Sequence, residues 1–261
     1  MFTSNPFAAL TEVLPASVMQ VYVVLMVLAV VAGTLFDIIH KGSAKYFFES
    51  WRSSRRKGPQ AVGGAEMASL AIKTGLVDVL ASGEFCGVRR RVAHLLTMYG
   101  FVIYVVTTVL MVFRYSTPAI ATPSILPLLW WIGGLMTCVG GYWFWFFIRA
   151  DVSAEGNSPL RIMRADLFVL SLLASVTLGL IWASLQARAS SATNMFFALY
   201  ILATTVLFGS VTWSKFAHMF FKPAAAFEKR VSYANGSRRN LPAASDKPEQ
   251  FARAREQPRH Y

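Results

Sequence analysis

Long apolar runs are the feature of this sequence that most restricts its fold. Five stretches reach the roughly 20 mostly apolar residues that a membrane-spanning helix needs, and they cover about 17–39, 94–113, 126–148, 167–186 and 195–217. Four of the five lack Asp, Glu, Lys and Arg over most of their length. Only 15% of the residues are charged, against roughly a quarter in soluble domains. The sequence therefore predicts an all-α membrane protein whose five transmembrane helices form a bundle.

Positive charge gathers on alternate connections between these runs. Ten of the 25 Lys and Arg residues lie in 40–93, three lie in 149–166, and ten lie from Lys215 onward. The other two, Arg114 and Arg188, lie on the remaining connections. Because connections rich in Lys and Arg stay in the cytoplasm, we expect the N-terminus outside and the C-terminus inside. The net charge of +12 then reflects topology, and we expect no nucleic-acid partner.

We predict a single five-helix transmembrane domain over 1–231 and a disordered, basic cytoplasmic tail over 232–261. The fifth span is expected to end at Lys222–Pro223. Within the cytoplasmic loop 40–93, the pattern of 65–85 indicates an amphipathic helix between helices 1 and 2. Such a helix would lie on the membrane surface or bind a partner, and a packed element without a special role is an equal alternative. The residues expected near one face are Met67, Leu70, Ala71, Val77 and Leu80.

Histidines supply the candidate redox site. Of the four in the chain, His40, His94 and His218 fall at predicted cytoplasmic helix ends, and His260 lies in the tail. A b-type haem with two histidine ligands takes one imidazole from each of two facing helices. His94 opens the second span and His218 closes the fifth, so the two could share one porphyrin. The alternative is that these histidines cap helix ends or reach toward water.

Two motifs around these histidines resemble those of a family of membrane cytochromes. The run Trp213-Ser-Lys-Phe-Ala-His-Met-Phe-Phe-Lys-Pro223 resembles the last helix of the cytochrome-b-type membrane subunits of the respiratory nitrate reductase gamma family. That family includes the membrane subunits of heterodisulfide reductase. The run Arg89-Arg-Arg-Val-Ala-His-Leu-Leu-Thr-Met-Tyr-Gly-Phe101 is similar to their second helix. The resemblance covers roughly 65–225, and within the family the chain looks like the membrane anchors associated with adenylylsulfate reductase.

The resemblance implies an electron-transfer anchor of sulfur metabolism in the bacterial cytoplasmic (inner) membrane. Cytoplasmic flavin and iron–sulfur subunits would dock on it and pass electrons to quinone through one haem b, with His94 and His218 as the axial ligands of its iron. The chain would be a non-catalytic or quinone-reactive subunit of an oxidoreductase complex. Two-haem members of the family carry a second histidine pair, and the matching positions here are Tyr104 and Tyr200. We therefore expect no outer haem.

Three cations near the inner membrane surface are candidates for contact with quinone or haem. Lys215 lies about one turn before His218, and Arg90 and Arg91 precede His94. Each could hydrogen-bond a quinone carbonyl or a haem propionate, because a cation stabilises the negative charge that develops there. Setting topology and contacting lipid headgroups is the alternative interpretation.

Other functions fit the sequence to different degrees. A haem-free structural anchor for the same kind of complex is the main alternative. A transporter is a less favoured alternative, because transport usually requires ionisable residues or broken helices within the spans. The glycine pairs Gly133-Gly134 and Gly140-Gly141 suit close helix packing instead. Cys86 falls in a loop and Cys138 in mid-span, so we expect no disulfide.

Overall fold

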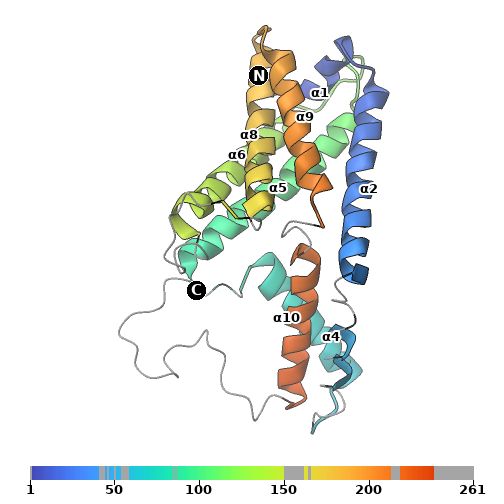
Figure 1. The fold of residues 1–261 in the computed structure, drawn as a ribbon, viewed down its shortest axis with the longest axis vertical. Coiled ribbons are helices and arrows are strands. Elements are labelled where there is room, and N and C mark those ends of the chain that lie inside the picture. Colours follow the sequence, from blue (N-terminus) through green and yellow to red (C-terminus); the bar gives the residue numbers. More distant parts are fainter. Residues whose placement is uncertain are drawn as a thin grey trace. The chain divides into compact units, whose positions relative to one another are not determined.

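The chain is helical and without strands in the residues that its structure, a computed structural model, describes (Figure 1). These are residues 2–40, 45, 47–49, 51–53, 59–83, 85, 87–149, 162–163, 166–212 and 218–237. Four helices are long and apolar enough to cross a membrane. They are α2 (Ala16–His40), α5 (Val88–Phe113), α6 (Ile125–Trp143) with its π-helical extension η3 (Phe144–Ile148), and α8 (Leu167–Ala187). The chain is therefore a multi-pass membrane protein.

The fifth apolar run is organised differently from the prediction. α9 (Thr193–Gly209) has 17 residues and so measures about 26 Å, somewhat short of the roughly 30 Å hydrocarbon core. A separate helix, α10 (His218–Ala234), begins further along the chain and contains Pro223. The prediction of one helix that ends at Lys222–Pro223 is therefore wrong. Gly209 and the following serine are weak helix formers and end α9, whereas the proline in α10 removes one backbone hydrogen bond without ending the helix.

The described helices belong to two compact units. The first comprises Met1–Thr34, Val92–Ile148 and Ile162–Lys215, and the second comprises Leu35–Arg91, Arg149–Arg161 and Phe216–Tyr261. The first unit holds α6, η3, α8, α9 and most of α2 and α5. It also holds a short N-terminal helix, α1 (Pro6–Ala9), and the turn η1 (Leu10–Glu12). The second unit holds α4 (Gly64–Lys73), η2 (Thr74–Leu80) and α10.

Two glycines of α6 bring α5 into backbone contact with it. A Cβ added at Gly133 would lie 2.8 Å from the carbonyl oxygen of Gly100, and one added at Gly140 would lie 2.6 Å from the carbonyl oxygen of Ala93. No side chain fits at either position without moving a helix backbone. Small residues at this spacing are typical of transmembrane helices that pack closely.

The second member of each glycine pair faces α8. A Cβ added at Gly134 would lie 2.8 Å from a methyl carbon of Leu180, and one added at Gly141 would lie 2.6 Å from a methyl carbon of Leu173. Neighbouring helix positions point about 100° apart, so each pair serves two different partner helices. The predicted close packing at both glycine pairs is confirmed.

Hydrogen bonds between helices add to this packing in the first unit. They are made by hydroxyl and indole groups, which in an apolar setting need a partner inside the protein. The pairs are Trp130–Thr108 at 2.9 Å, Tyr142–Thr177 at 2.9 Å, Ser175–Thr204 at 2.7 Å and Tyr22–Thr205 at 3.0 Å. Together they link α5 to α6, α6 to α8, α8 to α9 and α2 to α9.

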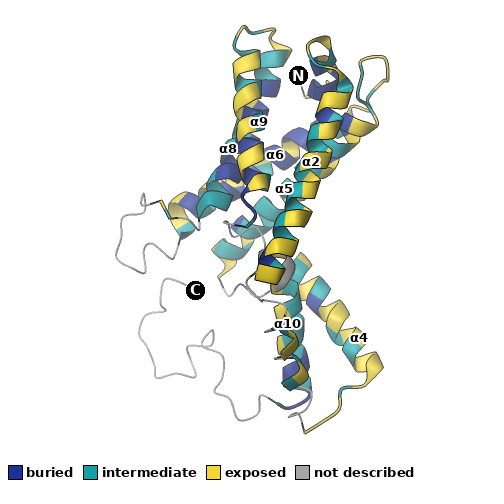
Figure 2. Cartoon of the chain, turned by 45° about the vertical axis from the view of Figure 1, so that its right-hand side comes forward, coloured by how far each residue is buried: buried dark blue, intermediate teal, exposed yellow. Residues whose placement is uncertain are grey.

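α2 keeps most of its surface uncovered by the rest of the chain (Figure 2). Only 6% of the most apolar part of this helix is buried, compared with 50% for α8. Its uncovered side chains are aliphatic or aromatic, including Val24, Leu28 and Phe36. This composition suits a helix whose outer side faces lipid.

The α5–α6 contact makes a prediction about stability. Gly140→Ala would push a methyl group against the Ala93 carbonyl, and overpacking of this kind costs about 1–3 kcal/mol. We expect a lower thermal unfolding midpoint for the detergent-solubilised protein, measured by light scattering or intrinsic fluorescence. Gly209→Ala is the matched control, since a Cβ there meets nothing within 4 Å. Equal midpoints for the two variants would contradict the close contact.

Candidate functional site

His94 lies near the start of α5, within the first unit, and its side chain is half-buried. The preceding residue, Ala93, is fully buried and faces Gly140 of α6. Phe101 follows His94 by seven residues and so shares its side of the helix. The ring of Phe101 lies 6.4 Å from that of Phe208, centroid to centroid. The side of α5 that carries His94 is therefore the side that faces α9.

His218 is the first residue of α10 and belongs to the second unit. It opens this helix and does not close the fifth span, which corrects the prediction. Its side chain lies outside the described residues, and so does Lys215. The pairing of His94 with His218 at one haem iron stays a prediction, as does the role of Lys215.

Arg90 and Arg91 make contacts within the second unit. The guanidinium carbon of Arg90 lies 5.6 Å from the centroid of the Phe85 ring, and Nζ of Lys222 lies 5.5 Å from the same ring. Both distances suit cation–π contacts. Nε of Arg91 donates a hydrogen bond to the carbonyl oxygen of Ala81 at 2.7 Å. These contacts favour a structural use of the two arginines, and their contact with quinone or propionate stays a prediction.

Asp37 is a buried carboxylate near the end of α2. Its exposed fraction is 4%, whereas its neighbour Phe36 is 55% exposed. Acidic residues within apolar helices are costly, and they often mark functional positions. An acid near the end of an otherwise apolar run is a sequence signal that could have pointed to this position.

Tyr104 and Tyr200, the two positions expected to replace a second histidine pair, lie in a cluster of aromatic side chains. Tyr104 stacks on Trp130 with ring centroids 4.9 Å apart, and Tyr200 stacks on Trp182 at 5.7 Å. The ring of Phe7 lies 6.0 Å from that of Trp130 and 5.4 Å from that of Trp182. All five side chains are buried. Four helices of the first unit therefore contribute to this cluster, together with the N-terminal helix α1.

The two tyrosines approach each other beside Gly179 of α8. A Cβ added at Gly179 would contact the hydroxyl of Tyr104 and would lie 3.1 Å from the ring of Tyr200. The absence of a side chain at this glycine thus makes room for both rings. Tyr104 comes from α5 and Tyr200 from α9, so the cluster brings these two helices together.

The N-terminal segment packs against the helices of the first unit. Asn5 caps α1, because its side-chain oxygen accepts hydrogen bonds from the backbone N–H groups of Phe7 and Ala8. Its amide nitrogen donates to the carbonyl oxygen of Tyr115 at 2.8 Å. An asparagine followed by proline is a known helix-start signal, and it could have located this helix. The segment places Phe7 in the aromatic cluster.

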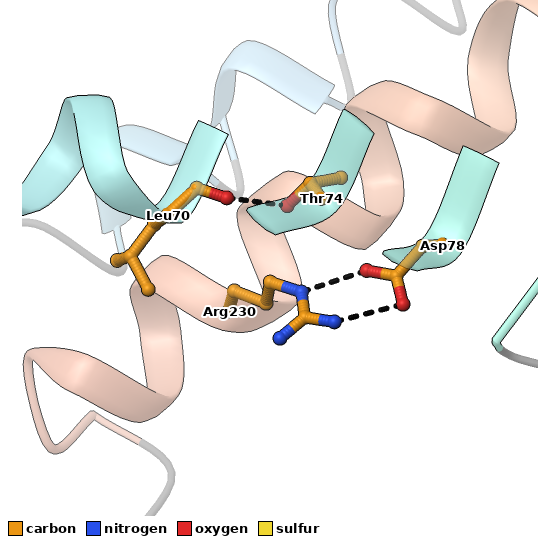
Figure 3. Close-up of polar contacts among 4 residues, drawn as sticks. All are labelled: Leu70, Thr74, Asp78 and Arg230. Atoms are coloured by element: carbon orange, nitrogen blue, oxygen red, sulfur yellow. Dashed lines mark hydrogen bonds and ion pairs between the residues drawn. The ribbon is translucent and has the colours of Figure 1, made fainter. Parts of the chain in front are cut away.

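The second unit is held by an ion pair that joins η2 to α10 (Figure 3). Nε and a terminal nitrogen of Arg230 donate to the two carboxylate oxygens of Asp78 at 2.7 and 2.8 Å. The hydrogen bond to Asp78 raises the pKa of Arg230 above its ordinary value. The side chains are 23% and 14% exposed. Two-pronged pairs of this kind fix orientation as well as adding energy.

The fold and these contacts define a multi-pass helical membrane protein with an aromatic cluster between its spans. Among the described residues, no group of three or more His, Cys, Asp or Glu side chains could hold a metal ion. A haem with two histidine ligands does not require such a group. Comparison with protein-family models, curated proteins and solved structures found no match for the chain.

The ion pair in the second unit can be tested by a double-mutant cycle. Asp78→Asn and Arg230→Gln should each speed amide hydrogen exchange in α4 and α10. The double variant should be little worse than either single variant, with a coupling energy of about 1 kcal/mol. Glu66→Gln is the control, because Glu66 is an exposed acid on α4. Additive effects of the two substitutions would show that the side chains do not interact.

Proposed function

We propose that this chain is the membrane anchor and electron-transfer subunit of a cytoplasmic flavin and iron–sulfur oxidoreductase, of the adenylylsulfate reductase kind. The soluble subunits dock on its positive side, and electrons reach the quinone pool through one b-type haem. His94 and His218 are the proposed axial ligands. The proposed setting is the bacterial inner membrane.

The observation that carries the proposal is the pairing of α5 with α9. The Phe101–Phe208 contact and the meeting of Tyr104 with Tyr200 bring the two helices together at two levels. In the resembling family the second and last helices hold haem. α5 matches the second helix, and α9 leads into the run 213–223 that resembles the last. His94 lies on the side of α5 that faces α9, and its half-buried side chain suits a ligand that is only partly covered by helices.

The distribution of charge supports the docking side. The loops around 40–93, 149–166 and the C-terminal segment carry 23 of the 25 Lys and Arg residues. With α9 counted as a fifth, short span, these segments share one side of the membrane, which the positive-inside rule places in the cytoplasm. A positive surface steers an acidic soluble partner toward this side.

The aromatic cluster limits where a haem can bind. The positions that match the family's second histidine pair are Tyr104 and Tyr200, and their rings stack on Trp130 and Trp182. A haem bound at this level would have to displace four buried rings, each of which contributes a large apolar area. We therefore propose one haem, next to the docking side. Transfer to quinone then takes place near that side and does not cross the whole bilayer.

A haem-free structural anchor is the second candidate. Two observations favour it: Arg90 and Arg91 contact Phe85 and Ala81, and His218 opens a helix of the second unit. In this alternative the chain fixes the soluble complex to the membrane, and the quinone site lies at the edge of that complex.

A reduced-minus-oxidised spectrum of the purified full chain distinguishes the two candidates. The proposed haem gives a b-type band in the wild-type protein. His94→Ala and His218→Ala should each abolish that band, because an imidazole ligand is lost, while leaving membrane insertion intact. His260→Ala in the C-terminal tail is the matched control and should keep the full band.

Three outcomes separate the parts of this proposal. A full band in His94→Ala would refute the ligand assignment. A wild-type protein without any band, which still co-purifies with a flavin and iron–sulfur partner, would support the haem-free anchor. A wild-type protein without band or partner, after co-expression with a flavin and iron–sulfur pair, would refute both candidates.

A further inference from the structure

One side of the α4–η2 helix carries an uncovered apolar stripe. Its large members are Ile72, Leu76 and Leu80, which are 62%, 57% and 48% exposed. Ala65 and Ala68 extend it toward the start of α4, and both are exposed. Exposed aliphatic residues that line up along a helix mark a surface that contacts another apolar phase.

The opposite side of the same helix is bound within the second unit. Asp78 pairs with Arg230 of α10, and Thr74 is buried, with its hydroxyl donating to the Leu70 carbonyl (Figure 3). Leu70, Thr74 and Asp78 follow one another at intervals of four residues, and so do Ile72, Leu76 and Leu80 on the stripe. The ion pair therefore fixes the roll of the helix and turns the stripe away from α10.

The π-helical geometry of η2 keeps each row of residues aligned along the helix. In an α-helix, residues four apart drift by about 40° at each step, so Leu80 would drift away from Ile72. The wider turn of a π-helix, with bonds from i to i+5, compensates for this drift between Thr74 and Leu80. One side thus holds α10 while the other carries a continuous stripe.

We infer that this stripe binds the surface of the chain's own lipid bilayer. Leu80 precedes Val88, the first residue of α5, by eight residues. A chain of that length reaches at most about 28 Å, so the stripe is tethered close to the membrane that α5 enters. The stripe has no aromatic residue, whereas protein–protein hot spots are rich in Trp, Tyr and Arg.

Charge at the start of α5 points to anionic lipid. Lys73 and Glu66 are both exposed on one flank of the stripe, where their charges offset each other, and Arg89 is exposed at the start of α5. Cations near an apolar helix side are typical of helices that lie in the membrane interface, where an anionic surface attracts them. The apolar residues would lie about 5–10 Å into the boundary between headgroups and acyl chains.

Spin labels can test this inference without reference to haem or a soluble partner. In a Cys86→Ser, Cys138→Ser background, labels would be placed by Leu76→Cys on the stripe and by Ser69→Cys on an exposed flank. The full chain would be studied in nanodiscs of phosphatidylglycerol and phosphatidylcholine. We expect the label at 76 to show a several-fold higher ratio of oxygen to aqueous nickel accessibility than the label at 69.

Two results would overturn the inference. Equal nickel accessibility at both positions would mean that the stripe faces water. Shielding of the label at 76 from both oxygen and nickel would mean that protein covers it. Because Leu76 is exposed, the label itself should not disturb the fold, and an unchanged thermal midpoint of the labelled protein would verify this.

Discussion

Direct contact between helix backbones at small residues is the constraint on which the first unit depends. Lipid tails are as apolar as leucine, so helices in a bilayer gain little from hiding apolar side chains from one another. They gain instead from close packing, in which many weak atom contacts add up. α6 meets this constraint with Gly133 and Gly140 against the backbone of α5, while Gly134 and Gly141 make room for leucine side chains of α8.

The orientation of α5 is a consequence of its contact with α6. Because Ala93 and Gly100 must face α6, the neighbouring positions His94 and Phe101 turn toward the next helix around the bundle, which is α9 at the level of Phe208. The candidate ligand is thus positioned by a packing requirement one residue away. On α8, the absence of a side chain at Gly179 makes room for the rings of two tyrosines from different helices.

The sequence predicted the apolar helices well, because the length and charge of a run depend on local composition alone. It did not predict the break between α9 and α10, since hydropathy does not distinguish one long helix from two. The partner of Asp78 was also out of reach, because Arg230 lies 152 residues away and neither residue has a distinctive neighbourhood. For the candidate site, His94 could be placed at a helix start, but its direction depends on the α5–α6 contact.

The π-helix η2 shows how a small change in backbone geometry alters an amphipathic pattern. The predicted amphipathic face placed Met67 and Leu70 with Val77 and Leu80, although at 100° per residue Leu80 lies about 140° from Met67 even in a uniform α-helix. In the structure the first two are partly covered, and the last two are exposed. The wider turn beginning at Thr74 rotates later residues relative to earlier ones. π-Helical turns are rare, and they are frequently found at functional sites. Here the turn reduces the drift of both rows of residues, so that one helix holds α10 through Asp78 and keeps a straight aliphatic side uncovered.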